Sequence, residues 1–210
     1  MRGITVFDKY AQAYDRWFNA NEHIYRAEEA ALRRFIPLTG AGLEIGVGTG
    51  RFAVPLGVTI GVEPAKSVAQ IARSRGIAVC QAMGEQLPFG DNQFDFALLV
   101  TVICFVADVP DLLWETRRVL KTGGRLVIAF IDKDSALGRL YESRKERDKF
   151  YREASFYSVA EVAQWTVKAG FGGLQFCQTI FGLPDKNPDA LQVRDGYGAG
   201  AFVVLSALRI

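Results

Sequence analysis

The stretch LEIGVGTGRF, from Leu43 to Phe52, decides how the rest of the chain is interpreted. A short apolar run leads into three glycines, Gly46, Gly48 and Gly50, that are separated by single residues. Because glycine has no Cβ, such a turn lets another group approach the backbone closely, and a following helix N-terminus offers free N–H groups. We therefore expect a strand, a tight turn over a ligand, and a helix that begins at Gly50.

Short β-rich runs alternate with helical ones along most of the chain. After GLEIG, the expected strands are VTIGVE, IAVCQA, FDFALLVTVICF, RLVIAFI, GLQFCQTIF and GAFVVLSALRI, with helices expected over 64–75, 108–120 and 158–169, the last ending at Gly170. Strands joined by helices need crossover connections, which give a mostly parallel sheet covered on both faces. The sequence predicts an α/β fold with a doubly wound, mostly parallel seven-stranded sheet and an antiparallel C-terminal end.

Two segments lie outside this alternation. Residues 8–36 show helical spacing of apolar residues with a break at 19–21, and we expect residues 1–37 to form a helical cap. Residues 132–157 are charged and rich in aromatic side chains, and we expect a solvated helical insert that acts as a variable lid. The length of 210 residues favours a single domain over 1–210.

Composition gives little reason to expect a nucleic-acid or membrane partner. The chain has 25 basic and 23 acidic residues, and no apolar run approaches the roughly 18 residues that cross a bilayer. The cysteines, Cys80, Cys104 and Cys177, are three in number, far apart and set among apolar residues, which is typical of buried thiols in a reducing compartment. We therefore expect a cytoplasmic protein.

Glu63 ends the expected strand VTIGVE and follows Gly46 by 17 positions. A carboxylate there suits a ribose diol, which dinucleotide-binding folds also recognise in this way, so a nicotinamide cofactor stays open. The dinucleotide fingerprint is G-x-G-x-x-G, whereas this loop reads G-x-G-x-G with Arg51 in the sixth place. Glu44 would repel a pyrophosphate but would suit a ligand that carries an ammonium group.

Together with the glycine loop, four other motifs, YAQAYDRWF, GVEPAKSVAQIAR, AMGEQLPFGDNQFDFALLVTVICFV and ETRRVLKTGGRLVIAF, occur in the order of a known family. From Phe7 to Phe171 the chain resembles the class I S-adenosylmethionine-dependent methyltransferases of the small-molecule type. The resemblance implies a Rossmann-like methyltransferase fold, S-adenosylmethionine as cofactor and a small-molecule methyl acceptor, with no nucleic acid and no membrane as partner.

The resemblance also implies a set of cofactor-binding residues along the motifs. Around the methionine moiety they are Glu44, Gly46, Gly48 and Gly50, with Thr101 near the transferred methyl group and Tyr14 on the capping helix. Around the nucleoside they are Glu63 for the ribose diol, Pro64 beside the adenine, and Met83, Gly84 and Glu85 along its edge. The family often has Asp-Ala-Glu at the last three positions, so the usual aspartate contact is missing here.

No catalytic residue is identified, because transfer from a sulfonium needs mainly proximity and alignment. His23 is either a base or a surface residue, and Tyr141, Tyr151 and Tyr157 either shape a substrate pocket or pack the lid. Asp132 and Asp134 alone make a poor metal site, so we expect no metal. A non-catalytic S-adenosylmethionine-binding regulatory protein and, less favoured, a nicotinamide-dependent oxidoreductase are the alternatives, and no oligomeric state is predicted.

Overall fold

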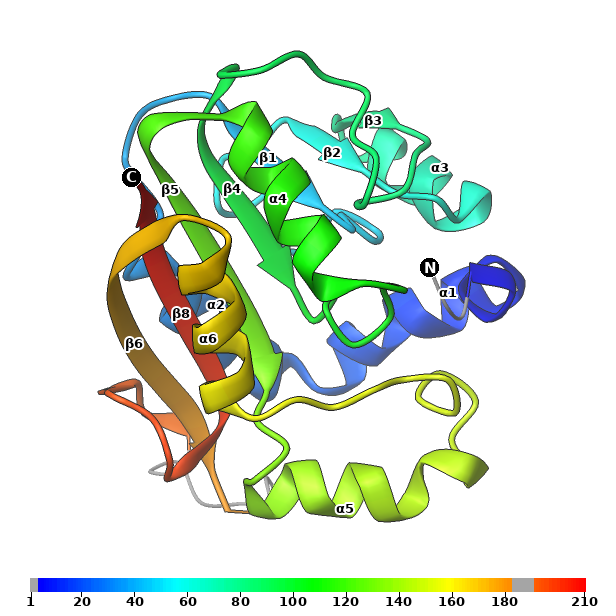
Figure 1. Cartoon of the computed structure of the whole chain (residues 1–210). Coiled ribbons are helices and arrows are strands. Elements are labelled where there is room, and N and C mark those ends of the chain that lie inside the picture. The colour runs from blue at the N-terminus through cyan, green and yellow to red at the C-terminus, as the bar shows by residue number, and fades with distance from the viewer. Residues whose placement is uncertain (1–3, 183–190) are drawn as a thin grey trace.

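The computed structural model describes residues 4–182 and 191–210 of the chain. Within these ranges, eight strands form one sheet in the order β3-β2-β1-β4-β5-β8-β6-β7 (Figure 1). The strands are β1 (Gly42–Ile45), β2 (Ile60–Val62), β3 (Ala78–Cys80), β4 (Phe94–Val100), β5 (Leu120–Ile131), β6 (Phe171–Phe181), β7 (Arg194–Asp195) and β8 (Gly200–Arg209).

The pairing directions confirm the predicted sheet. Strands β3, β2, β1, β4 and β5 pair in parallel, and β8 lies antiparallel between β5 and β6. All seven predicted strands are present. The eighth, β7, is a two-residue antiparallel pairing with β6, in a stretch for which we predicted no strand. So short and polar a pairing leaves no pattern in the sequence.

Helices cover both faces of the sheet. They are α1 (Ile4–Ala20), α2 (Glu22–Arg33), α3 (Lys66–Ser74), α4 (Val109–Val119), α5 (Ala136–Arg144), the 3-10 helix η1 (Lys145–Arg147) and α6 (Val159–Lys168). Figure 1 shows α4 and α6 in front of the sheet and α2 behind it. Side chains of β4 alternate between the two layers, so that Ala97 and Leu99 pack with the α4 and α6 side while Leu98 and Val100 pack with the α2 side.

The helix predicted to begin at Gly50 is wrong. Residues 51–57 form consecutive turns, held by bonds such as Val54 N to Gly50 O at 3.2 Å and Leu56 N to Phe52 O at 3.2 Å. Pro55 has no backbone N–H, so a regular helical ladder is broken at its centre.

The solvated helix predicted over 132–157 is only partly right. Helical structure ends at Arg147, and the chain then continues in turns and extended segments in which Ala154 and Phe156 are buried against Cys104 and Phe105. The expectation of three buried thiols also needs correction, because Cys80 is only half-buried on β3, the strand at one edge of the sheet.

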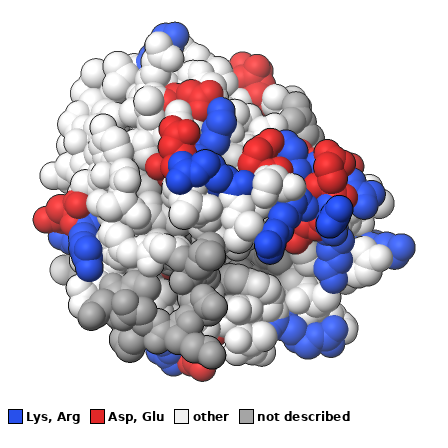
Figure 2. All heavy atoms as spheres, turned by 90° about the horizontal axis from the view of Figure 1, so that it is seen from below, with Lys and Arg blue, Asp and Glu red and all other residues white. Residues whose placement is uncertain are grey.

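The cap predicted at the N-terminus is positioned where the parallel strands end. Figure 1 shows α1 running across the lower ends of these strands, with α5 below it. In the two described ranges, no helix is both long and apolar enough to cross a bilayer. Figure 2 shows basic side chains next to acidic ones on the face seen from below, without a broad field of one sign. The lid segment contributes such a pair, Lys145 with Glu142 at 2.7 Å.

Candidate active site

The glycine loop turns sharply at the end of β1. Gly46, Gly48 and Gly50 have φ values of +71°, +55° and +80°, a region that other residues rarely adopt. A Cβ on Gly46 would lie 2.4 Å from Val102 Cγ2, whereas one on Gly48 would meet the Tyr14 ring at 3.5 Å, an ordinary contact. At Gly46 both space and backbone conformation require glycine, and at Gly48 the conformation alone requires it.

Glu63 closes the loop from the end of β2. Its carboxylate accepts N–H groups from Gly48 at 3.0 Å and from Ala65 at 2.9 Å. Burial raises the pKa of Glu63 to about 7, although these two N–H groups oppose the shift. The group can therefore gain or lose its proton near neutral pH.

Glu44, on β1, is almost completely buried, and its Oε2 atom has no hydrogen-bond partner among the described residues. Burial raises its pKa well above the ordinary value. The unsatisfied oxygen is sealed inside the protein, and Glu44 lies outside the lining of the cavity described below. The glycines and Glu63 fit the methionine and ribose parts of S-adenosylmethionine.

Helix α1 is held over the loop by two acidic residues. Asp15 receives hydrogen bonds from Arg51 Nε at 2.9 Å and from Arg75 Nη1 at 2.7 Å, and Asp8 accepts the N–H of Ser67 at 2.6 Å. Burial raises the pKa of Asp15, but the two guanidinium groups outweigh it and hold that pKa well below its usual range. These contacts fix Tyr14 above Gly48.

Thr101, immediately after β4, has a φ of +52°. Its N–H donates to the Ala129 carbonyl at 2.8 Å, and its own carbonyl accepts from Cys104 Sγ at 3.2 Å. A β-branched residue in the left-handed region is strained by about 1–3 kcal/mol, and such strain gathers at functional sites.

A cavity of about 230 Å³ extends from the glycine loop toward α1 and the lid segment. Of the residues predicted from the sequence, those that line it are Tyr14, Gly46, Gly48, Glu63 and Thr101. The predicted residues outside its lining are Glu44, Gly50, Pro64, Met83, Gly84 and Glu85. Gly84 instead packs on α4, where an added Cβ would lie 2.7 Å from Leu112 Cδ1, and Glu85 accepts the N–H of Ala107 at 2.8 Å.

The far part of the cavity is aromatic. Its aromatic rings come from α1, from the turns that follow the glycine loop and β4, and from the lid segment. They are Phe7, Tyr14, Trp17, Phe18, Phe52, Phe105, Tyr141, Phe150 and Tyr151. Phe150 joins the lid segment to α1, since its ring centroid lies 5.5 Å from that of Phe7 and 5.9 Å from that of Tyr14. Tyr141 and Tyr151 thus line the pocket, as one interpretation proposed, whereas Tyr157 packs on Trp165.

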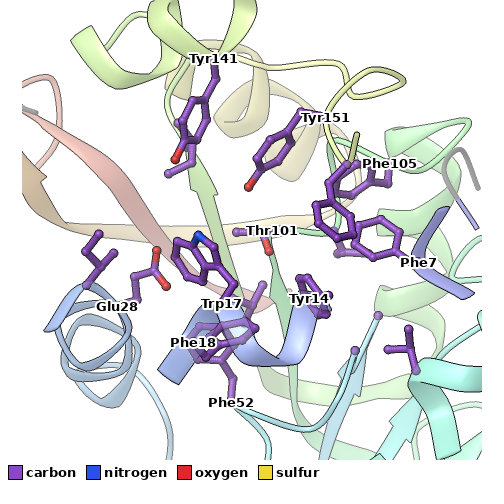
Figure 3. A pocket seen from close by; sticks show the side chains of 18 of the residues that line it. Phe7, Tyr14, Trp17, Phe18, Glu28, Phe52, Thr101, Phe105, Tyr141 and Tyr151 are labelled. Carbon is purple, nitrogen blue, oxygen red and sulfur yellow. The ribbon is translucent and has the colours of Figure 1, made fainter. Parts of the chain in front are cut away.

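Glu28 is a lining residue that sequence reasoning missed. It is 7% exposed, and burial raises its pKa to about 8. Figure 3 shows its carboxyl group pointing toward Trp17, in the space into which Tyr141 and Tyr151 direct their hydroxyl groups. A signal was present, because position 28 belongs to the stripe of buried residues on α2 that also includes Ile24, Ala27, Ala31 and Leu32.

His23 is exposed on α2 and does not line the cavity. Across the described ranges, no group of three or more His, Cys, Asp or Glu residues is arranged to hold a metal ion. The site is thus built from backbone, carboxyl groups and rings.

Comparison with known proteins identifies the family. A family model described as a methyltransferase domain matches residues 43–128. An uncharacterized protein of Methanocaldococcus jannaschii is 50% identical over 99% of this chain and 100% of its own length. A demethylmenaquinone methyltransferase of Tropheryma whipplei is 33% identical over 59% of this chain and 56% of its own length.

Among solved structures, one from Thermotoga maritima is 44% identical and covers 100% of both chains with a TM-score of 0.95. It is described as an S-adenosylmethionine-dependent methyltransferase and a possible histamine N-methyltransferase. The matches do not support the nicotinamide-dependent alternative. The order of strands, the glycine loop and these relatives show that the chain belongs to the class I S-adenosylmethionine-dependent methyltransferases.

Proposed function

We propose that this methyltransferase acts on a small organic molecule bound in the aromatic part of the cavity, with the cofactor at the glycine loop. The observation that carries the proposal is the continuity of the cavity. One cavity of about 230 Å³ is lined by Gly48 and Glu63 as well as by Tyr141 and Tyr151 of the lid segment. A cavity of this size suits a compact acceptor.

Some lining residues bind the cofactor, and others orient the acceptor. Gly46 and Gly48 leave room for the methionine part, Glu63 accepts the ribose hydroxyls, and Tyr14 covers the loop. Pro64 and residues 83–85 would border the adenine outside the described cavity. When bound, S-adenosylmethionine supplies a methyl group on a positively charged sulfur, which is already activated toward attack. Thr101 and the surrounding rings then orient the acceptor and exclude water.

The cap, residues 1–37, and the lid segment, residues 132–157, would cover this space within a single domain. The relatives differ in the acceptor that their names suggest, which is demethylmenaquinone for the Tropheryma whipplei protein and, as a possibility, histamine for the Thermotoga maritima protein. Both are small molecules, which supports the proposed class.

The test has two parts. Isothermal titration calorimetry should show that S-adenosylmethionine and S-adenosylhomocysteine bind and that NADH does not. Gly48→Val should lose binding, because valine fits neither the φ of +55° nor the ligand. Gly57→Val is the matched control, since Gly57 has a φ of +74° and open surroundings.

Turnover is measured as S-adenosylhomocysteine formed in the presence of a metabolite extract from which macromolecules have been removed. Product that depends on the extract supports a small acceptor. Cofactor binding without product in any extract, or product only with added protein or nucleic acid, would contradict the proposal.

A further inference from the structure

The wall of the cavity carries one buried acid without a partner, Glu28 of α2. Its side chain lines the cavity and points into it (Figure 3). Among the described residues, no hydrogen bond or ion pair reaches its carboxyl group, and burial alone shifts its pKa. An unpaired buried carboxyl destabilises a fold, so a group at this place is expected to meet its partner in a ligand.

The other acids of the wall are already bonded. Asp148 Oδ1 accepts the N–H groups of Phe150 at 2.8 Å and Tyr151 at 3.0 Å, and Glu63 accepts two N–H groups of its own. The lining residues in the described part of the chain include no lysine, arginine or histidine. An acceptor that carries a phosphate or carboxylate would therefore meet carboxyl groups and no counter-ion.

Aromatic rings surround the same space. Trp17 and Glu28 both line it, and Tyr141 and Tyr151 direct their hydroxyl groups into it from the lid segment (Figure 3). The electron-rich faces of such rings attract an organic cation, most strongly when it is shielded from water. Rings and carboxyl group thus favour the same kind of ligand.

Resting on the proposed methyltransferase function, we propose that the acceptor is an organic amine that binds as its ammonium ion. Glu28 pairs with the ammonium group and takes the proton that the nitrogen must lose before methylation. The nitrogen lone pair then forms a bond to the methyl carbon while the carbon–sulfur bond breaks, and sulfur keeps that electron pair. The methylated product leaves as an ammonium ion, and the proton on Glu28 passes to solvent.

The titratable groups that face Glu28 leave it free to act near neutral pH. They are the phenols of Tyr14 from α1, Tyr141 from α5 and Tyr151 from the following turn, and burial together with the charge of Glu28 raises the pKa of each. These phenols therefore stay uncharged near neutral pH.

The test compares amines with their neutral alcohols. Benzylamine, 2-phenylethylamine and tryptamine, each with the corresponding alcohol, are titrated by calorimetry into protein saturated with S-adenosylhomocysteine. The variant is Glu28→Gln, which keeps size and removes charge, and the control is Glu22→Gln in the exposed first turn of the same helix. At least one amine should bind wild type and control at least about tenfold more tightly than the variant, as expected for a lost charge-assisted contact.

The alcohols should bind wild type and variant alike. Amine binding at pH 7 should also release close to one proton in wild type and none in Glu28→Gln, measured from the heats in two buffers of different ionisation enthalpy. The proposal is overturned if no amine binds more tightly than its alcohol, or if Glu28→Gln retains amine affinity to within tenfold.

Binding of S-adenosylhomocysteine separates this inference from the function on which it rests. Wild type that fails to bind it refutes the proposed function itself. The Glu28→Gln variant could instead fold, as judged by thermal unfolding, and yet fail to bind S-adenosylhomocysteine. That result would make Glu28 a cofactor ligand and would overturn the amine proposal alone.

Discussion

Thr101 and Ile180 are two β-branched residues that line the cavity with a positive φ, +52° and +61°. Thr101 is the one predicted to lie near the transferred methyl group. It stands where β4 ends, lines the cavity, and holds a left-handed conformation that its branched side chain disfavours. Two hydrogen bonds, from its N–H to Ala129 and from Cys104 to its carbonyl, keep it there. Such strain gathers at functional sites, which supports the proposed role of Thr101 beside the cofactor and the acceptor.

Replacing Thr101 by glycine should relieve this strain. We expect Thr101→Gly to raise the free energy of unfolding by about 1 kcal/mol, measured by urea denaturation, while methyl transfer slows because the side chain is lost. Thr101→Ala is the matched control, since it keeps a Cβ and hence the strain. Equal stabilisation by both variants would show that φ is not the cause.

Glu63 gives cofactor binding a pH dependence. Its pKa is about 7 in the free protein because of burial, and ribose hydroxyls would donate to the charged form and lower that pKa. Affinity for S-adenosylhomocysteine should therefore rise as pH increases through about 7 and then level off. Calorimetry between pH 5.5 and pH 8 measures this, and Glu63→Gln should bind more weakly with a flat profile. An unchanged slope in the variant would assign the titration elsewhere.

Helix α1 is attached to the rest of the site by Asp15. Its carboxylate bridges Arg51 in the turn after the glycine loop and Arg75 at the end of α3. Both ion pairs are well shielded, with side-chain exposures of 17% for Asp15, 20% for Arg51 and 27% for Arg75. Loss of this anion leaves two guanidinium groups without a counter-ion.

We expect Asp15→Asn to lower the free energy of unfolding by roughly 1–3 kcal/mol, since breaking a part-buried pair is costlier than breaking an exposed one. Hydrogen exchange should speed up along α1 more than along α4. Asp91→Asn, which removes an exposed partner of Arg118, should change stability by less than about 1 kcal/mol. Similar losses in both variants would contradict an anchoring role.

Elements also decide how far the sequence could predict the site. Gly46, Glu63 and Thr101 directly follow the ends of β1, β2 and β4. Because parallel strands bring such ends together, the order of strands along the chain was enough to predict that these three residues meet. Glu28 and Phe150 come from a helix and an irregular segment that meet only through tertiary packing. The helix predicted at Gly50 failed for a different, local reason, because the strand–turn–helix pattern predicted a helix that Pro55 interrupts.

For the whole molecule, buried acids set the response to pH. Burial raises the pKa of Glu28 to about 8, that of Glu63 to about 7 and that of Glu44 further above its ordinary value. The folded state then binds more protons than the unfolded state between about pH 4.5 and pH 8, so stability falls as pH rises there. Asp15 acts in the opposite sense, because its lowered pKa gives stability that is lost below about pH 4.

The free energy of unfolding should therefore be greatest near pH 5 and lower by several kcal/mol at pH 8, at about 1.4 kcal/mol for each unit of pKa shift. Urea denaturation across this range measures it. Glu28→Gln should be more stable than wild type at pH 8 and should reduce the decline. A curve that rises from pH 5 to pH 8 would contradict the assigned buried acids.

The contact of Phe150 with Phe7 and Tyr14 has a consequence for the timing of the reaction. The Phe150 ring reaches α1 from the lid segment, so under the proposed function we expect reactants and products to exchange with solvent when these two elements separate. Catalysis would then proceed as a series of brief openings, and the residence time of the spent cofactor, rather than the speed of methyl transfer, would limit how many molecules are processed each second.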